Sequence, residues 1–251
     1  MPRHFTTPSG ALGFQDLVHA KEKSAESTET DAIAKSRHLV LSEETRKSRL
    51  APRQFLSPKW PQLQYGAVPE VDPSKYWLTL KTCEAQCDIT YHDLLDQPRT
   101  HLTSVDFHCV TGWSILDADF EGIPVLELFR LFGLDVDHFT RVFTTCVDGF
   151  TGSLPASRVK EAFVVTHAYG KPLEPKHGFP VRLLVPTLYG FKSAKWVREI
   201  FLTPEDRLGF WEIRGYDDSA DPWLEERFAG ATGQDGLTAA QRAKHALKKG
   251  K

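Results

Sequence analysis

One stretch decides how this chain is interpreted: Val105-Asp106-Phe107-His108-Cys109-Val110-Thr111-Gly112-Trp113-Ser114. It joins an alternating strand pattern to a turn, with a cysteine where the two meet. In a strand, Phe107 and Cys109 share one face and His108 lies on the other. Such a cysteine is usually a small buried hydrophobe, but a thiolate at a rigid strand end can also hold a metal or act as a nucleophile. Taken alone, the stretch favours a core thiol.

The composition fits one globular domain with a substantial core, because 41% of the 251 residues are hydrophobic. The formal net charge of -2 gives no overall field that would attract nucleic acid or an anionic membrane. No apolar run approaches the ~20 residues that span a bilayer, and the first residues lack the apolar core of a signal peptide. We therefore expect a cytoplasmic protein with no nucleic-acid partner and no membrane span.

The chain divides by composition into three parts. Residues 1–50 hold few aromatics and lack an apolar period, so we expect a flexible or loosely packed extension, within which Ser42 could cap a short helix. Residues 51–230 carry the dense apolar signal of the domain. Residues 231–251 are expected to form a C-terminal basic helix or tail.

Helices and strands mix within the domain without a regular strand–helix alternation. A helix is predicted at 124–132, where Pro124 suits the first position and Gly133 the stop. A helical turn is predicted at 92–95, and strands at 76–80, 141–147, 162–166, 181–185 and 209–216. This order favours an α+β fold with a mixed sheet in a single domain.

Several common sites have little support. There is no Gly-x-Gly-x-x-Gly and no Gly-Lys-Ser/Thr loop, so nucleotide sites are not indicated. The four cysteines do not suggest a disulfide scaffold in a chain this long. Cys83 and Cys87 have a spacing that some zinc sites use, with His92 as the one nearby candidate ligand, which is too few for a structural site.

A second stretch changes the interpretation of Cys109. Residues 177–198 place an apolar strand between His177 and Arg182 on one side and Lys192, Ser193 and Lys195 on the other. Basic groups, a hydroxyl and glycine-containing turns can converge on an anionic group. A solvated face beside a strand would have the same composition.

Together the two stretches resemble the molybdopterin-binding domain of the sulfite oxidase family. The resemblance rests on residues 107–114 for the cysteine motif and on 177–182 with 192–196 for the cofactor clamp. Residues 209–216 and 221–223 are similar to the ending of its short soluble bacterial-type members. It covers about residue 55 to about residue 228, which makes 51–230 a molybdopterin-binding oxidoreductase domain. The implied fold is the mixed-sheet α+β fold of that family.

The resemblance implies a role for each matched residue. Cys109 would be the protein's ligand to molybdenum and the catalytic cysteine, since soft thiolates suit such a metal. The residues implied to contact the molybdopterin are Gln64, Tyr65, His108, Thr145, His177, Arg182, Ser193, Ala194 and Lys195.

The chain departs from the sulfite-oxidising members in ways that bear on its substrate. Leu63 stands where those members carry an oxyanion-binding arginine, and no arginine follows Cys109 closely. The resemblance therefore implies two-electron oxygen-atom transfer on a small-molecule substrate. The expected reaction is reduction of an S-oxide or N-oxide, or a related oxidation, rather than oxidation of sulfite. Electrons would pass to or from a separate protein or quinone-linked partner, and we expect a monomer.

Two other functions stay open on the sequence. One is a non-catalytic anion- or pterin-binding module with the same fold. The other is a hydrolase in which Cys109 is the nucleophile and His108 or His177 its base.

Overall fold

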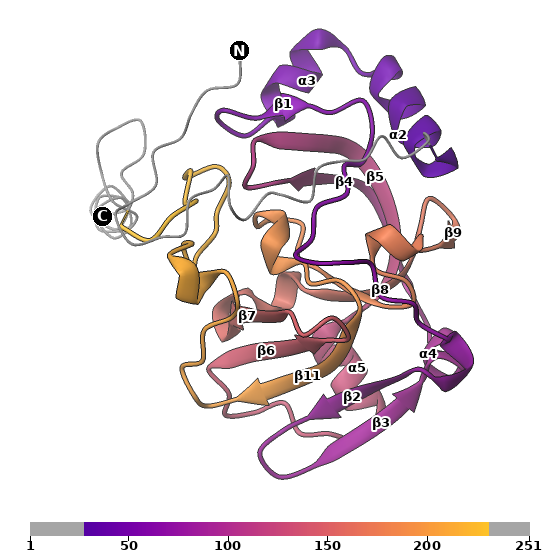
Figure 1. Ribbon diagram of the computed structural model, residues 1–251, viewed down its shortest axis with the longest axis vertical. Helices are drawn as coiled ribbons and strands as arrows, with labels where there is room; N and C mark the ends of the chain where they lie inside the picture. The colour runs from indigo at the N-terminus through magenta and orange to yellow at the C-terminus, as the bar shows by residue number, and fades with distance from the viewer. Residues whose placement is uncertain (1–27, 231–251) are drawn as a thin grey trace.

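The computed structural model describes residues 28–230, which form two mixed β-sheets with short helices around them (Figure 1). This confirms the predicted α+β class. One sheet has the order β1-β5-β8-β10, with β4 paired to β5 and β9 to β8. Its strands are β1 (Phe55–Leu56), β4 (Thr100–His108), β5 (Trp113–Pro124), β8 (Phe163–Ala168), β9 (Lys171–Pro172) and β10 (Arg182–Leu184).

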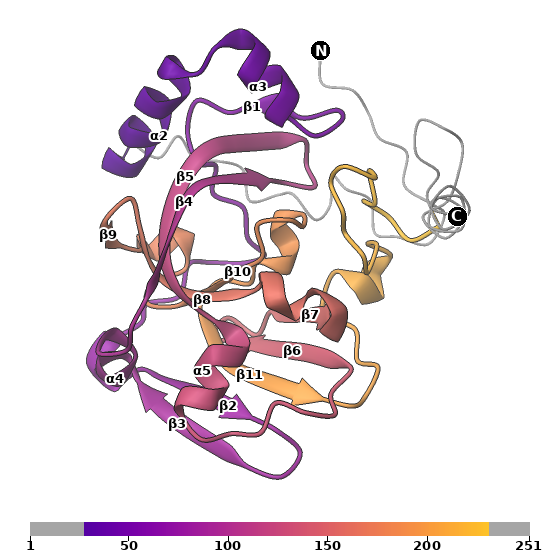
Figure 2. The same ribbon diagram turned by 180° about the vertical axis from the view of Figure 1, so that it is seen from behind.

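The second sheet has the order β3-β2-β11-β6-β7. Its strands are β2 (Trp77–Lys81), β3 (Gln86–Thr90), β6 (Arg141–Cys146), β7 (Thr151–Pro155) and β11 (Val197–Thr203). Seen from behind, the helix α5 (Val125–Leu131) lies over this sheet (Figure 2). It buries Val125, Leu128 and Phe129, the spacing expected of a helix with one apolar face. The predicted helical turn is α4 (Tyr91–Leu95).

The long hairpin of β4 and β5 carries the opening sequence. His108 pairs with Ser114, and residues 109–112 form the turn between the strands. The backbone N–H of Cys109 donates to the carbonyl of Trp113 at 2.8 Å, and the N–H of Gly112 donates to the carbonyl of Cys109 at 3.0 Å. Gly112 has a φ of +105°, a conformation that glycine adopts most easily. Cys109 therefore lies at the start of a fixed turn, one residue beyond the strand.

Part of the N-terminal extension differs from the prediction. Residues 28–50 are not loosely packed, because α2 (Glu29–Val40) buries Asp31, Ala34 and His38. The Nε2 atom of His38 lies 3.0 Å from the backbone carbonyl of Leu116 on β5. The buried side chains of α2 are polar or small, and for this reason the helix shows no apolar period in the sequence. Residues 1–27 and the predicted tail at 231–251 lie outside the described residues.

A short α3 (Glu43–Arg49) follows, with Ser42 as its N-cap as predicted. Its last residue, Arg49, forms ion pairs with Asp106 at 2.6 Å and with Asp117 at 2.7 Å, and so joins α3 to both strands of the hairpin. In Figure 1 both helices lie beyond β5, on the side away from the five-stranded sheet. No helix of residues 28–230 is long and apolar enough to cross a membrane.

The prediction of a strand at 209–216 is wrong. The segment forms a 3-10 turn, η5 (Glu212–Arg214), which ends at Gly215 with a φ of +91°. Glu212 points inward because the Nζ of Lys192 lies 2.5 Å from its carboxylate. A strand would have turned alternate side chains away from this contact. The turn carries Trp211 and Tyr216 to the wall of a pocket.

Candidate active site

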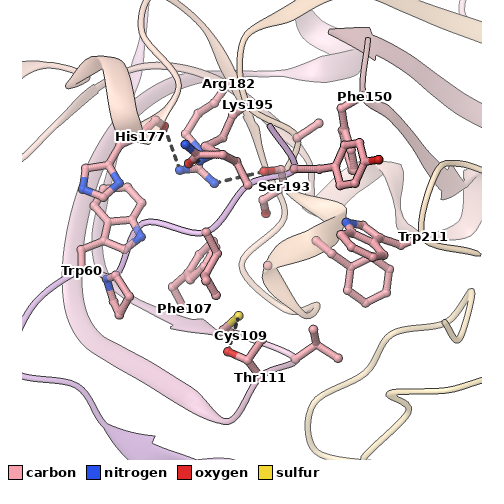
Figure 3. A pocket seen from close by; sticks show the side chains of 18 of the residues that line it. Trp60, Phe107, Cys109, Thr111, Phe150, His177, Arg182, Ser193, Lys195 and Trp211 are labelled. Atoms are coloured by element: carbon pink, nitrogen blue, oxygen red, sulfur yellow. Dashed lines mark hydrogen bonds between the residues drawn. The ribbon is translucent and has the colours of Figure 1, made fainter. Parts of the chain in front are cut away.

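A pocket forms where the β4–β5 turn meets the two stretches singled out in the sequence. Figure 3 shows Arg182, Lys195 and Ser193 gathered on one side of the opening and the sulfur of Cys109 on the other. Trp60 and His177 flank it at one end of the view, and Phe150 and Trp211 at the other. Segments far apart in the sequence thus share one cavity.

The thiol of Cys109 is buried but faces this cavity. The hydroxyl of Thr111 donates to its sulfur at 3.2 Å. Burial raises the pKa of the Cys109 thiol, and this outweighs the lowering by Thr111 and by the positive charges of Arg227 and Lys195. A free thiol here is protonated at neutral pH, so a metal ligand at this position would lose its proton on binding.

Arg182 and Lys195 face the cavity, and neither has an ion-pair partner in the described part of the chain. Arg182 is buried and donates to the backbone carbonyls of His177 at 3.0 Å and Ser193 at 3.1 Å. Lys195 donates to the side-chain oxygen of Gln64 at 3.1 Å. Within residues 28–230, no carboxylate lies within ion-pair distance of either cation. Burial lowers the pKa of Arg182 to about 9 and, together with the charge of Arg182, that of Lys195 to about 7. Both side chains would be stabilised by an anion.

A short turn, η3 (Pro175–His177), orients these cations. Its three successive carbonyls accept from Trp196 Nε1 at 2.8 Å, Lys195 Nζ at 2.9 Å and Arg182 at 3.0 Å. Gly178 follows with a φ of +109°, and a Cβ there would lie 3.0 Å from the Cβ of Arg182 and 3.2 Å from that of Lys195. The turn and its glycine let the two cations approach one another.

His177 belongs to the same wall. Its ring stacks on Trp60, with centroids 4.0 Å apart and planes 9° from parallel. Its Nε2 is buried and has no hydrogen-bond partner in the described part of the chain. Burial and the charges of Lys176, Arg182 and Lys195 lower the pKa of His177 well below its usual value, so the ring is neutral at pH 7. A buried polar atom left unsatisfied beside a cavity indicates a ligand that would use it.

The remaining predicted contacts divide in two. Gln64, Tyr65, Ser193 and Ala194 line the pocket with the residues above. The hydroxyl of Ser193 accepts from the backbone N–H of Val185 at 2.9 Å, which fixes its position.

His108 and Thr145 are not among the lining residues, so the structure does not support these two predictions. His108 has the opposite strand parity to Phe107, and its Nδ1 lies 2.7 Å from the hydroxyl of Ser114. Thr145 lies on β6 between Glu199 and Thr151, outside the cavity. Lys192, from the same motif as Lys195, contacts Glu212 and Asp218 instead of the pocket.

Sequence reasoning missed much of the pocket wall. The lining residues it did not assign include Trp60, Phe107, Asp148, Phe150, Phe191, Trp211 and Tyr216. The proline-rich loop around Trp60 was a usable signal, since long aromatic loops often bind ligands. The predicted strand at 209–216 would place Trp211 and Tyr216 on opposite faces, so it gave no sign that both side chains line the pocket.

The donor set fits the cofactor that the resemblance implies. Two unpaired cations, the Ser193 hydroxyl and the unsatisfied Nε2 of His177 suit an anionic, hydrogen-bonding group such as a pterin phosphate. One thiol opens into the same cavity, and a soft metal would accept it. In the described part of the chain no three His, Cys, Asp or Glu side chains group as a metal site, so Cys109 would be a single protein ligand.

The site gives poor support to a cysteine hydrolase. The described contacts of Cys109 include no histidine, because His108 bonds to Ser114 and His177 stacks on Trp60. The raised pKa of Cys109 also disfavours the nucleophilic thiolate.

Comparisons with known proteins agree with this site. A family model described as an oxidoreductase molybdopterin binding domain matches residues 65–211. The uncharacterized oxidoreductase YuiH of Bacillus subtilis is 34% identical over 184 residues, which is 72% of this chain and 92% of that protein. A putative protein-methionine-sulfoxide reductase subunit, YedZ1 of Azospira oryzae, is 32% identical over 49% of this chain and 45% of its own length.

More distant relatives share parts of the chain. Human mitochondrial sulfite oxidase is 32% identical over 71 residues, covering 27% of this chain and 13% of that protein. The sulfane dehydrogenase SoxCD of Paracoccus pantotrophus has a similar fold, with a TM-score of 0.52 and 21% identity over 57% of this chain and 42% of the other. Except for YuiH, these proteins are matched over less than half of their own length.

Proposed function

The chain belongs to the family of oxidoreductase molybdopterin-binding domains, and from this premise we propose that it reduces a small, neutral S-oxide or N-oxide by oxygen-atom transfer. Family members such as sulfite oxidase are enzymes, so the chain is a molybdopterin-binding oxidoreductase. The substrate, its direction of turnover and the role of Cys109 are the proposed parts.

One observation carries the proposal. The sulfur of Cys109 opens into the cavity that holds the unpaired cations Arg182 and Lys195. We assign Cys109 as the ligand to molybdenum, and Arg182, Lys195, Ser193 and His177 as the residues that hold the molybdopterin. When bound, the cofactor supplies the two-electron step in which the S–O or N–O bond breaks, and the oxygen leaves as water with two protons.

The walls beyond the cations favour a neutral substrate with an apolar body. Phe150, Phe191 and Trp211 line the cavity, and so does Leu63, where the resemblance implies an arginine in the sulfite-oxidising members. Among the described lining residues Arg182 is the sole arginine. Arg227 is not among these lining residues, although its charge acts on Cys109 and its guanidinium donates to the carbonyl of Val110.

Two features of the cavity wall bear on the exclusion of water and on proton transfer. Apolar and aromatic walls exclude water, which strengthens the hydrogen bonds made within the cavity. Asp148 is the one carboxylate among the described lining residues, and burial raises its pKa, which makes it the candidate proton donor at the cavity. We propose that electrons come from a separate donor, and the naming of the YedZ1 relative as a subunit supports such a partner.

A substrate panel tests the proposal directly. Holoenzyme with an artificial electron donor should reduce methyl phenyl sulfoxide or an aliphatic N-oxide, and it should oxidise sulfite poorly. Cys109→Ser should abolish turnover, while Cys83→Ser, at an exposed cysteine, should not change it. Efficient sulfite oxidation with no S-oxide or N-oxide reduction would refute the substrate assignment.

A further inference from the structure

Helix α2 precedes the segment that the family model matches, yet its residues contact two segments that adjoin the proposed clamp. We propose that Asp31 of α2 is a positioning residue that locks the molybdopterin clamp closed. This inference rests on the proposed assignment of Arg182, Lys195 and His177 to the cofactor.

Asp31 is a buried carboxylate that bridges two separate segments. Its Oδ1 accepts from the backbone N–H of Trp60 at 3.0 Å, and its Oδ2 lies 3.5 Å from the Nζ of Lys176. The residue itself is 3% exposed. A carboxylate is buried at such a site only when charge and hydrogen bonds compensate it, so these contacts hold both segments to α2.

The first segment is the proline-rich loop of Trp60. The Trp60 ring stacks on His177, and the Arg182 guanidinium lies 5.2 Å from its centre. The position of the ring therefore sets the positions of two clamp residues. Asp31 fixes the backbone that carries this ring.

The second segment is the turn η3, whose carbonyls orient Arg182, Lys195 and Trp196. The turn is tied to α2 through Lys176 and through Glu174, which accepts from the hydroxyl of Thr30. Lys176 thus contacts Asp31 through its side chain and Lys195 through its carbonyl. Without Asp31, both the loop and the turn would lose their common anchor.

Mutating a group that orients metal or cofactor ligands usually lowers the affinity about 10–100-fold. We therefore expect Asp31→Ala holoenzyme to release its pterin about tenfold faster than the unmodified protein. Asp31→Asn should fall between the two, because an amide oxygen can still accept from Trp60 while the charge facing Lys176 is lost.

Asp31 is also part of the N-terminal cap of α2, and this role must be separated from the proposed one. Ser42→Ala is the control for lost helix capping, because it removes the N-cap side chain of α3, and no described contact of Ser42 reaches the clamp. Thr30→Val is a second test, since it cuts the independent link to Glu174 and leaves Asp31 in place.

The experiment measures the release of fluorescent pterin from full-length holoenzyme, with the melting temperature of the same samples. Faster release in Asp31→Ala and in Thr30→Val, with unchanged release in Ser42→Ala, supports the proposal. Wild-type release in Asp31→Ala with a lowered melting temperature overturns it and leaves Asp31 a helix cap. Arg182→Met tests the clamp assignment separately: if it retains cofactor fully, the assignment fails whatever Asp31 does.

Discussion

The hydroxyl of Thr111 donates a hydrogen bond to the sulfur of Cys109 across 3.2 Å, inside a two-residue span of the β4–β5 turn. Hydrogen bonds to a ligating sulfur withdraw electron density from it and favour the reduced metal. Thr111→Val should therefore lower the reduction potential of the bound molybdenum, and Thr111→Ser should restore it. Redox titration of the holoenzyme followed by absorbance measures both. An unchanged potential in Thr111→Val would contradict the proposed role of Cys109 as the metal ligand, or show that the hydroxyl does not reach its sulfur in the holoenzyme.

The charge of Lys195 should control how strongly the empty clamp binds an anion. Its pKa is lowered to about 7, so it is mostly charged at pH 6 and mostly neutral at pH 8. Arg182, with a pKa of about 9, stays charged over this range, and His177 stays neutral. A ligand that binds only the folded state raises the melting temperature. Sulfate should therefore stabilise cofactor-free protein more at pH 6 than at pH 8.

Lys195→Met supplies the comparison. It should show a small sulfate effect at both pH values, because the titrating charge is gone. The same protein without sulfate corrects for the pH dependence of folding itself. A sulfate effect that keeps its pH dependence in Lys195→Met would assign the titration to another group at the cavity, with Asp148 the first candidate.

Leu63 should be the position at which the substrate class can be changed. It lines the pocket where the sulfite-oxidising relatives are expected to carry an arginine. A charge-assisted hydrogen bond contributes about 1.5–3 kcal/mol, which corresponds to roughly tenfold or more in kcat/KM. Leu63→Arg should raise kcat/KM for sulfite by about this factor and lower it for a neutral sulfoxide. Leu63→Gln is the control, because it adds a polar group without a charge. An equal gain in kcat/KM for sulfite in Leu63→Gln would show that the charge of the arginine is not the cause.

The sequence could identify the chemistry of the site better than its geometry. Cys109, Arg182 and Lys195 were predicted because two motifs together resemble one family, although neither motif is specific alone, and all three line the pocket. His108 was predicted from the same motif as Cys109 but does not line the pocket, because strand alternation sends neighbouring side chains to opposite faces. Thr145 was predicted from a separate strand and does not line the pocket either. A motif therefore predicts the segment more safely than it predicts each member.

Contacts over long sequence distances were beyond prediction from a single chain. Asp31 and Trp60 are separated by 29 residues, and Asp31 and Lys176 by a much larger span. The inward turn of Glu212, which overrode a plausible strand pattern, depends on Lys192 twenty residues earlier. The predicted α+β class needed none of these contacts, since local periodicity sufficed for it. The predicted cytoplasmic location stays a prediction.

Lys192 and Lys195 should have different roles: replacing Lys192 should lower folding stability, and replacing Lys195 should weaken anion binding. Lys192 is buried, with its Nζ 2.5 Å from Glu212, 3.1 Å from Asp218 and 2.9 Å from the carbonyl of Ser153. Removing one partner of a buried ion pair costs about 3–5 kcal/mol, because the remaining charge is left uncompensated. Lys192→Met should therefore lower the free energy of unfolding in urea by about that amount.

Lys195 has no carboxylate partner within the described chain, so Lys195→Met leaves no orphaned charge behind. It should lose sulfate and pterin binding with a much smaller change in unfolding free energy than Lys192→Met. Lys192→Met, studied at low urea where it is still folded, should keep its sulfate response because the clamp cations are intact. The reverse pattern would mean that Lys192, and not Lys195, faces the anion, and that the turn at 190–192 is placed differently from the structure described.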